Sequence, residues 1–227
     1  MYRSVLSVFA LCPVLTHSLA AAPLVQIDFG VSGQQSPAAS WNNVTVDLDE
    51  VPEPTTLITD LIDSNGNPTG AGFVFVSNAG SAGPVDVSYT AATGDAATLD
   101  ANAVRDLFFV NIDSTNSGAG AEAVFRFTGL TAPVYDLSLF AALNPSRSNT
   151  VYTINGVSQS ISPTGNTDFV DFLAIAPTAG TIEFTITRGG SDAAYINALT
   201  LTAIPEPASL MLLAAGSLVL SGRRRSA

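Results

Sequence analysis

The sequence predicts an all-β protein built as a two-sheet β-sandwich. Short stretches rich in β-branched and aromatic residues alternate apolar and polar positions with a period of two. Gly, Pro, Asn, Asp and Ser, the usual turn residues, lie between these stretches. No stretch between residues 21 and 203 keeps a helical apolar period beyond about two turns. About a dozen short strands with no strong helix between them are typical of a sandwich.

The expected strands follow one another closely along the middle of the chain. The clearest is Thr181–Thr187, whose three large apolar residues share one face. Asn155-Gly156 between Thr150–Ile154 and Val157–Ile161 predicts a type I′ hairpin turn. The other expected strands are Leu24–Phe29, Val44–Leu48, Thr56–Ile62, Gly72–Ser77, Val85–Tyr89, Leu107–Asn111, Ala123–Thr128, Val134–Ala141, Phe169–Ile175 and Tyr195–Thr202.

Residues 1–20 have the pattern of a secretory signal peptide. Arg3 precedes a short apolar stretch, and Ser18-Leu19-Ala20 provides a small-x-small cleavage site, so we expect cleavage after Ala20. This segment predicts the Sec export machinery as a partner.

Export has a chemical consequence, because cleavage removes the chain's one histidine, His17, and its one cysteine, Cys12. The sequence also contains no lysine. The mature chain therefore cannot build a Ser-His-Asp or Cys-His catalytic site, a Schiff-base lysine, or a zinc site of His or Cys ligands. We expect a protein that is not an enzyme.

The C-terminus carries a short apolar run followed by a cluster of positive charge. The run extends from Ala208 to Leu220, or to Gly222 with its small flanking residues, and Arg223, Arg224 and Arg225 follow. A stable span usually needs about 20 residues, so residues 208–222 predict a short transmembrane helix. By the positive-inside rule, the arginines stay cytoplasmic and the body of the protein lies outside.

Pro205, Glu206 and Pro207 stand directly before this run, and the three parts together resemble the PEP-CTERM sorting signal. The resemblance implies that the inner membrane holds the tail transiently, until an exosortase, a membrane cysteine protease, cuts it near the tripeptide. It also implies a Gram-negative-type bacterium that makes exopolysaccharide, and a mature protein secreted or attached at the cell surface. The internal Pro-Glu-Pro at residues 52–54 has no apolar run after it.

These features divide the chain into a signal peptide (residues 1–20), a β-sandwich ectodomain (21–203) and a sorting segment (204–227). The ectodomain contains four arginines and 18 carboxylates, a formal charge of −14. This charge argues against nucleic-acid binding, which needs a basic face. One domain is the expectation, and a split into two small sandwiches near residue 115 is the alternative.

Short motifs through the ectodomain carry a second resemblance. Ile27-Asp28-Phe29-Gly30, Trp41-Asn42-Asn43 and the later Tyr195-Ile-Asn-Ala-Leu199 are similar to jelly-roll sandwiches of the galactose-binding-like and malectin-like kind. The resemblance implies a jelly-roll fold. It says little about function, because this fold hosts enzymes, lectins and spacers alike.

Two groups of residues are candidates for ligand binding. Trp41 with Asn43 offers an aromatic face and an amide of the kind that carbohydrate-binding sites use. Arg147 with Asn149 offers a guanidinium fork in a loop between two strands. In the alternative interpretation, which we favour, Trp41 is buried at the end of the sandwich and Arg147 forms a structural salt bridge.

The sequence marks no metal ligands and no cofactor. Asp63, Asn65 and Asn67 alternate oxygen side chains, but Pro68 and Val74 occupy positions where a calcium-binding EF-hand loop needs Gly and Glu. A structural Ca²⁺ fits a jelly roll, although no motif marks its place.

The leading hypothesis is an exported, non-catalytic protein of the cell surface or extracellular matrix, with exopolysaccharide as a candidate partner. Two alternatives stay open. The first is a carbohydrate-binding module. The second is a glycan hydrolase that uses two of the carboxylates.

Overall fold

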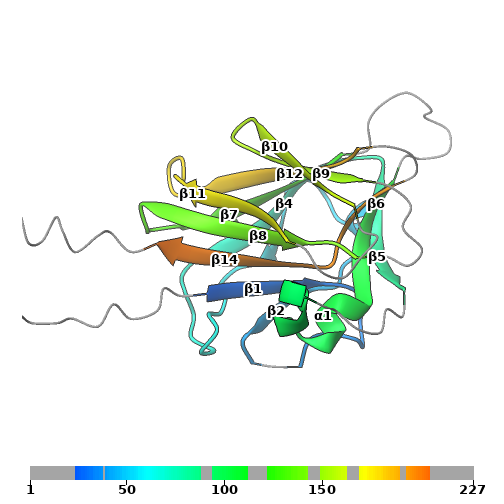
Figure 1. The fold of residues 1–227 in the computed structure, drawn as a ribbon, viewed down its shortest axis with the longest axis horizontal. Coiled ribbons are helices and arrows are strands. Elements are labelled where there is room, and N and C mark those ends of the chain that lie inside the picture. The colour runs from blue at the N-terminus through cyan, green and yellow to red at the C-terminus, as the bar shows by residue number, and fades with distance from the viewer. Residues whose placement is uncertain are drawn as a thin grey trace, which may run out of the picture.

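The computed structural model describes residues 24–37, 39–87, 94–111, 122–142, 149–162, 169–189 and 193–204. These residues form fourteen strands in three sheets, and the two larger sheets face one another as a sandwich (Figure 1). The prediction of an all-β, two-sheet sandwich is confirmed. The predicted segments at residues 1–20 and 205–227 lie outside the described residues. Within the described residues, no helix is long and apolar enough to cross a membrane.

The first sheet has the order β11-β8-β14-β1-β2 and is antiparallel except for the pair β1–β2. Its strands are β11 (Val170–Ile175), β8 (Val134–Phe140), β14 (Ala198–Ile204), β1 (Leu24–Phe29) and β2 (Trp41–Val44). The second sheet has the order β10-β9-β12-β7-β4-β3. Its strands are β10 (Val157–Ile161), β9 (Thr150–Ile154), β12 (Ile182–Arg188), β7 (Glu122–Thr128), β4 (Gly72–Ala79) and β3 (Thr55–Ile58).

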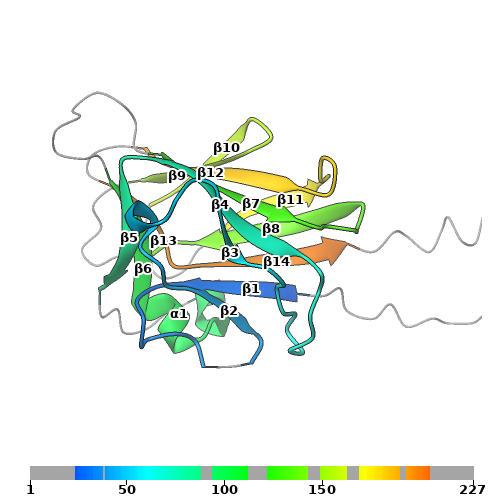
Figure 2. The ribbon, with the colours of Figure 1, turned by 180° about the vertical axis from the view of Figure 1, so that it is seen from behind.

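A third, smaller sheet with the order β13-β6-β5 lies at one end of the sandwich (Figures 1 and 2). It consists of β13 (Ala193–Ile196), β6 (Asp106–Asn111) and β5 (Ser81–Asp86). Three short helical segments complete the described part of the chain. They are η1 (Leu48–Glu50), η2 (Gly94–Thr98) and α1 (Ala101–Arg105).

Strands from distant parts of the sequence pair in both large sheets. In the first sheet β1 pairs with β14, and in the second β4 pairs with β7. The predicted β9–β10 hairpin forms as expected, with Asn155 and Gly156 at φ values of 50° and 78°. A type I′ turn needs positive φ at both central positions, which explains why Asn and Gly stand there.

Several of the predicted strands were wrong in detail. The strand predicted at Val44–Leu48 lies earlier, as β2, so Trp41 begins a strand that pairs in parallel with β1 rather than lying in a loop. The strand predicted at Val85–Tyr89 likewise begins earlier, as β5. The single strand predicted at Tyr195–Thr202 is interrupted at Asn197, so that β13 and β14 belong to different sheets. A fully buried asparagine that uses its hydrogen bonds across the break causes this interruption.

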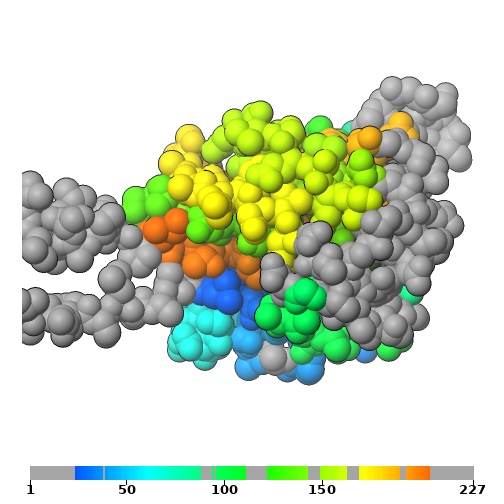
Figure 3. All heavy atoms as spheres, viewed as in Figure 1, coloured from blue at the N-terminus to red at the C-terminus, as the bar shows by residue number. Residues whose placement is uncertain are grey.

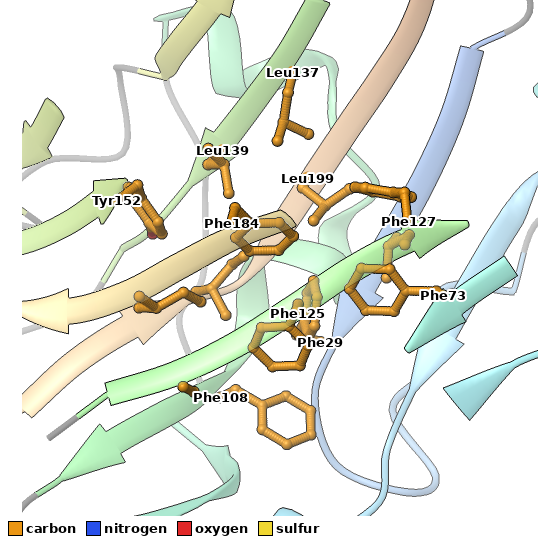
Figure 4. Packing of buried hydrophobic residues seen from close by; sticks show 14 of the residues in the cluster. Phe29, Phe73, Phe108, Phe125, Phe127, Leu137, Leu139, Tyr152, Phe184 and Leu199 are labelled. Atoms are coloured by element: carbon orange, nitrogen blue, oxygen red, sulfur yellow. The ribbon is translucent and has the colours of Figure 1, made fainter. Parts of the chain in front are cut away.

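Phenylalanine rings from both large sheets form the centre of the core (Figure 4). Phe29 comes from the first sheet and meets Phe73 and Phe125 of the second edge-on, at ring-centroid distances of 5.9 and 5.7 Å. Phe73 and Phe125 stack on one another at 5.5 Å, and Phe184 stacks on Phe125 at 5.5 Å. Each buried ring of this size contributes roughly 1.5–3 kcal/mol of transfer free energy.

A second buried layer lies on the opposite, outward face of the first sheet. There α1 lies beside β1 and β2 (Figures 1 and 2). Asp100 caps the helix by accepting a hydrogen bond from the backbone N–H of Asn102 at 2.9 Å. Trp41, Ala103 and Ala198 form a small apolar cluster in this layer.

Candidate functional site

Both ends of the described chain leave the sandwich at the same place. Leu24, the first residue of β1, pairs with Thr202 of β14. Figure 3 shows the orange end of β14 beside the blue start of β1 at one end of the molecule. The predicted sorting segment begins at Ile204, which is also the last residue of β14. We call this end of the sandwich the tail junction.

Strand β14 stays paired as far as the tail junction. Residues up to Thr202 are hydrogen-bonded between β1 and β8, because β14 is an inner strand of the first sheet. Ala203 and Ile204 pair with Tyr135 and Val134 of β8. Within the described residues, the strand is therefore part of the sheet to its last residue.

A cavity of about 520 Å³ opens at the tail junction. Val25, Tyr135, Leu201 and Ile204 form its strand side, and the turn at residues 129–133 and the loop at 63–71 form the rest. The Tyr135 hydroxyl accepts hydrogen bonds from the backbone N–H groups of Thr131 and Ala132, at 3.0 and 2.9 Å. These two bonds fix the turn that borders the cavity.

The most unusual chemistry lies elsewhere, on the outward face of β1. Val25, Ile27 and Phe29 point into the core, so Asp28 points to the opposite face of β1. Gly30, two residues later, lies on the same side as Asp28. The carboxylate of Asp106 sits directly on Gly30. A Cβ atom added there would lie only 2.1 Å from its Oδ2. Glycine is thus required at position 30 because another side chain's carboxylate takes the space.

Asp28, Ser36 and Asp106 form what we call the outer-face acidic cluster. The loop after β1 supplies donors to both acids. The backbone N–H of Val31 donates to Asp106 Oδ2 at 2.6 Å, and that of Ser36 donates to Asp28 Oδ2 at 2.7 Å. Asp28 is only 2% exposed and Asp106 is fully buried. Their second oxygens, both Oδ1, have no hydrogen-bond partner among the described residues.

Burial raises the pKa of both acids. It raises the pKa of Asp28 to about 6, against the opposing effect of the hydrogen bond from the Ser36 backbone N–H. Burial also raises the pKa of Asp106 to about 7, against the Val31 hydrogen bond, and the negative charge of Asp28 raises it further.

The side chain of Asn197 links the backbone at Asp106 to two other segments of the chain. Its Nδ2 donates to the backbone carbonyls of Asp106 and Val104, at 2.7 and 3.2 Å. Its Oδ1 accepts from the backbone N–H of Ala142 at 2.7 Å. Because Asn197 is fully buried, these bonds satisfy its side chain in place of water, and its backbone bonds to Phe29 and Phe140.

The structure separates the residues predicted to bind a ligand. Trp41 is 7% exposed and packs beneath α1, so its ring offers no open face for stacking a sugar. Asn43 accepts a hydrogen bond from the Ser36 N–H at 3.0 Å. Asn149 is exposed just before β9 in the second sheet, and Arg147 lies outside the described residues. The burial of Trp41 favours the alternative in which it is a packing residue.

Sequence reasoning did not place Asp106 in a site, and it noted Asp28 and Asn197 only as parts of short motifs. Asp28 and Asp106 lie far apart in the sequence, Asp28 within β1 and Asp106 at the start of β6. No local signal marks Asp28, because it shares the outward face of β1 with another polar residue, Gln26. The predicted processing residues Ala20, Pro205, Glu206, Pro207, Arg223, Arg224 and Arg225 all lie outside the described residues.

Several solved structures are similar to this chain at low identity. The Bacillus subtilis protein YXIM is 18% identical with a TM-score of 0.41, over 80% of this chain and 40% of that one. A family 35 carbohydrate-binding module from an environmental isolate is 20% identical with a TM-score of 0.31, over 59% and 93%. Bacteroides uniformis beta-glucuronidase 2 is 16% identical with a TM-score of 0.40, over 73% and 20%. Similarities of this degree carry no argument about function.

No curated protein matches the chain. Its C-terminal segment, in contrast, matches the family model of the PEP-CTERM protein-sorting motif over residues 203–225. The matched segment begins in the last two residues of β14 and includes the tripeptide, the apolar run and the arginines. The prediction of a PEP-CTERM motif at the C-terminus is therefore confirmed: this chain carries a C-terminal PEP-CTERM sorting motif.

Proposed function

We propose that the protein is an exported, non-catalytic sandwich that an exosortase releases at the cell surface or into the extracellular matrix. The observation that carries this proposal is the position of the sorting motif. It begins at residue 203, where β14 ends, so the processing signal follows the folded body without a linker. Sec export and exosortase cleavage are the two steps that the terminal segments imply.

The pairing at the tail junction limits where cleavage leaves an intact fold. A cut before Thr202 would remove part of an inner strand that β1 and β8 both bind. A cut after Ile204 leaves every described pair of β14 in place. We therefore infer that cleavage occurs C-terminal to Ile204, in or beyond Pro205–Pro207, and that the mature chain ends level with the sandwich.

The same geometry supports a position of the body close to the bilayer before cleavage. Three residues separate Ile204 from the apolar run that begins at Ala208, and three extended residues span at most about 11 Å. The tail junction therefore faces the membrane, and the acidic body extends away from it. After cleavage the negative charge of the ectodomain favours solubility.

The buried state of the acidic cluster supports a non-catalytic role. A glycan hydrolase needs two carboxylates that a substrate can reach, at a separation suited to its mechanism. Asp28 and Asp106 are the two described acids with strongly raised pKa values, and both are covered by the loop after β1. A carbohydrate-binding role remains the alternative, but the buried ring of Trp41 does not favour it.

The sorting proposal is tested by following the size and location of an epitope-tagged protein in a host that processes such tails. Replacing Arg223–Arg225 with serine, or Glu206 with glutamine, should leave a longer, membrane-associated precursor. Glu53→Gln changes the same residue type in the internal Pro-Glu-Pro and should be processed normally. Unchanged processing of both tail variants would contradict the proposal.

A further inference from the structure

We propose that β10 is a self-association edge, along which two copies of this chain pair antiparallel and join their second sheets into one continuous sheet. The partner is a second copy, and the surface is the outer edge of Val157–Ile161. The proposal concerns the folded body and does not depend on how the tail is processed.

The outer edge of β10 carries backbone groups without hydrogen-bond partners. β10 is the last strand of the second sheet and pairs there with β9 alone (Figure 1). Because the two-residue turn closes on Ile154 and Val157, alternate residues of β10 bond to β9. Ser158 and Ser160 therefore direct their N–H and C=O groups away from β9. Both serines are exposed, and these groups have no partner in the part of the chain that the structure describes.

The other three edges of the two large sheets are protected against such pairing. At β2, the side chain of Asn42 exchanges hydrogen bonds with the backbone N–H and C=O of Ile62, at 2.9 and 3.0 Å, and so covers this edge with a loop. β3 and β11 each contain a register shift, at Thr56–Ile58 and at Phe172–Ile175. Covering an edge or bending it with a bulge is how proteins prevent edge-to-edge pairing. β10 has neither device, because its register with β9 is continuous and its residues include no proline and no charge.

Charge favours a second copy at this edge. The ectodomain has a formal charge of −14, so two copies repel one another in general. The segment 149–162, which forms β9, β10 and their turn, contains no charged residue. A partner of the same charge therefore meets no opposing charge on this hairpin, whereas a basic partner would find no acid on it to bind.

The order of residues in β10 is self-complementary. A twofold axis at Gln159 places Ser158 of one copy opposite Ser160 of the other, and each such pair exchanges two N–H···O=C bonds. The same axis places Val157, which is 57% exposed, opposite Ile161 of the other copy. Pairing therefore satisfies the free backbone groups and covers an exposed apolar side chain together.

The edge is already ordered before it pairs. Gln159 donates from Nε2 to the backbone carbonyl of Asp171 in β11, at 2.7 Å, and ties β10 to the facing sheet. The hydroxyls of Ser158 and Thr153 lie 2.8 Å apart and link β10 to β9. Because the strand is held in place, association does not have to order it.

The test is sedimentation equilibrium of the purified exported protein over a range of concentrations. Pairing along one short edge makes a small interface, so we expect a dissociation constant roughly between micromolar and millimolar, and a mass that rises from one chain to two. Amide hydrogen exchange measured by NMR locates the contact, because the N–H groups of Ser158 and Ser160 should exchange more slowly in the dimer. A mass of one chain at about millimolar concentration, or a dimer in which these two amides are not protected, would overturn the proposal.

Ser160→Pro is the decisive variant. The N–H that it removes points away from β9, so the hairpin keeps its own bonds while each copy loses one donor to the other. Association should weaken at least about tenfold. Ser160→Ala, the matched control, keeps the N–H and should associate like the unmodified protein. Equal association of the proline and alanine variants would contradict the proposal.

If Ser160→Pro does not fold, Val157→Asp decides, because this exposed side chain can change without disturbing the core and the new charge would face Ile161 of the other copy. Leu173→Asp is its control, since Leu173 is 70% exposed but belongs to the bulged edge β11. We expect Val157→Asp to abolish the dimer and Leu173→Asp to retain it. A dimer that survives Val157→Asp, or one that Leu173→Asp also abolishes, would overturn the proposal.

Discussion

The two buried layers on either side of the first sheet are built on different physical principles. Between the large sheets, phenylalanine rings pack at centroid distances of 5.0–6.2 Å, and no single contact is directional enough to be indispensable. On the outward face, Asp28, Asp106 and Asn197 depend on individual hydrogen bonds to named backbone groups. β1 serves both layers, because its alternate residues point to opposite faces.

This difference predicts different responses to substitution. A core of packed rings loses stability in proportion to the volume removed, and a smaller apolar side chain recovers part of the loss. A buried polar network loses stability according to how many donors and acceptors are left unpaired, and an apolar side chain of the right size recovers little. Substitutions in the two layers can therefore be compared directly.

The largest effect is expected from Phe125→Ala in the core. Phe125 contacts the rings of Phe29, Phe73, Phe75 and Phe184, and it is 1% exposed. Removing the ring should lower the free energy of unfolding by about 3–5 kcal/mol, measured by urea denaturation. Phe125→Leu should recover a substantial part of this loss. Equal losses for alanine and leucine would contradict volume-dependent packing.

The next largest effect is expected from Asn197→Ala in the polar layer. This change leaves the Ala142 N–H and the carbonyls of Val104 and Asp106 without their partner, and should cost about 3 kcal/mol. Asn197→Leu, which restores the volume, should be no more stable than the alanine variant. The matched control is Asn102→Ala, whose side chain bonds at the surface and should cost less than about 1 kcal/mol. A leucine variant close to wild type would show that volume matters more than hydrogen bonding here.

The strands of the apolar core could largely be predicted from the sequence, because their signals are local. The period-two alternation in Thr181–Thr187 and Leu24–Phe29 is a local signal, and it correctly indicates the strands that supply Phe184 and Phe29 to the core. The Asn155-Gly156 turn is equally local, because two positive φ angles restrict the residue types at two adjacent positions. The C-terminal motif is also contiguous, which explains why the sequence reveals it.

The outer-face acidic cluster is not local, and so the sequence did not reveal it. The burial of Asp106 depends on its contact with Gly30, just after β1, and the burial of Trp41 depends on the short helix α1. Trp41 illustrates the general difficulty. Its flanking Pro, Ser and Asn residues predict a loop, but pairing with β1 makes it the start of an edge strand. The burial of Asp106, and both the burial and the strand conformation of Trp41, therefore depend on tertiary contacts.

An intermediate effect is expected from pH in the presence of a chelator. Burial raises the pKa of Asp28 and Asp106 to about 6 and about 7 from 3.8, so the folded state holds their protons more tightly than the unfolded state. The contribution of these two acids to the free energy of unfolding is fully present below about pH 4. It is lost as the pH rises to about 7, by up to about 1.4 kcal/mol per pH unit for each acid. The nearby acids Asp100 and Asp86 act in the same direction on Asp28 and Asp106 respectively.

Asp106→Asn should flatten this dependence, because the amide stays neutral at every pH while its oxygen can still accept the Val31 N–H. The measurement is urea unfolding of both proteins between about pH 5 and 8 in EDTA. The comparison isolates Asp106 from the other acids, which titrate in both proteins. Parallel pH profiles would show that Asp106 is ionised in the folded protein throughout this range.

The smallest effect is expected from Tyr152→Phe, which removes one polar contact from within the apolar core. Tyr152 is fully buried, and its hydroxyl donates to the backbone carbonyl of Tyr195 at 2.6 Å. Burial raises the pKa of this hydroxyl, so it remains a donor at every accessible pH. Its loss should cost about 1 kcal/mol, since a single neutral hydrogen bond is removed and the ring still packs. If Tyr152→Phe shifted the urea midpoint as much as Asn197→Ala, the prediction would be contradicted. One hydrogen bond within the core would then stabilise the protein as much as all the side-chain hydrogen bonds of Asn197.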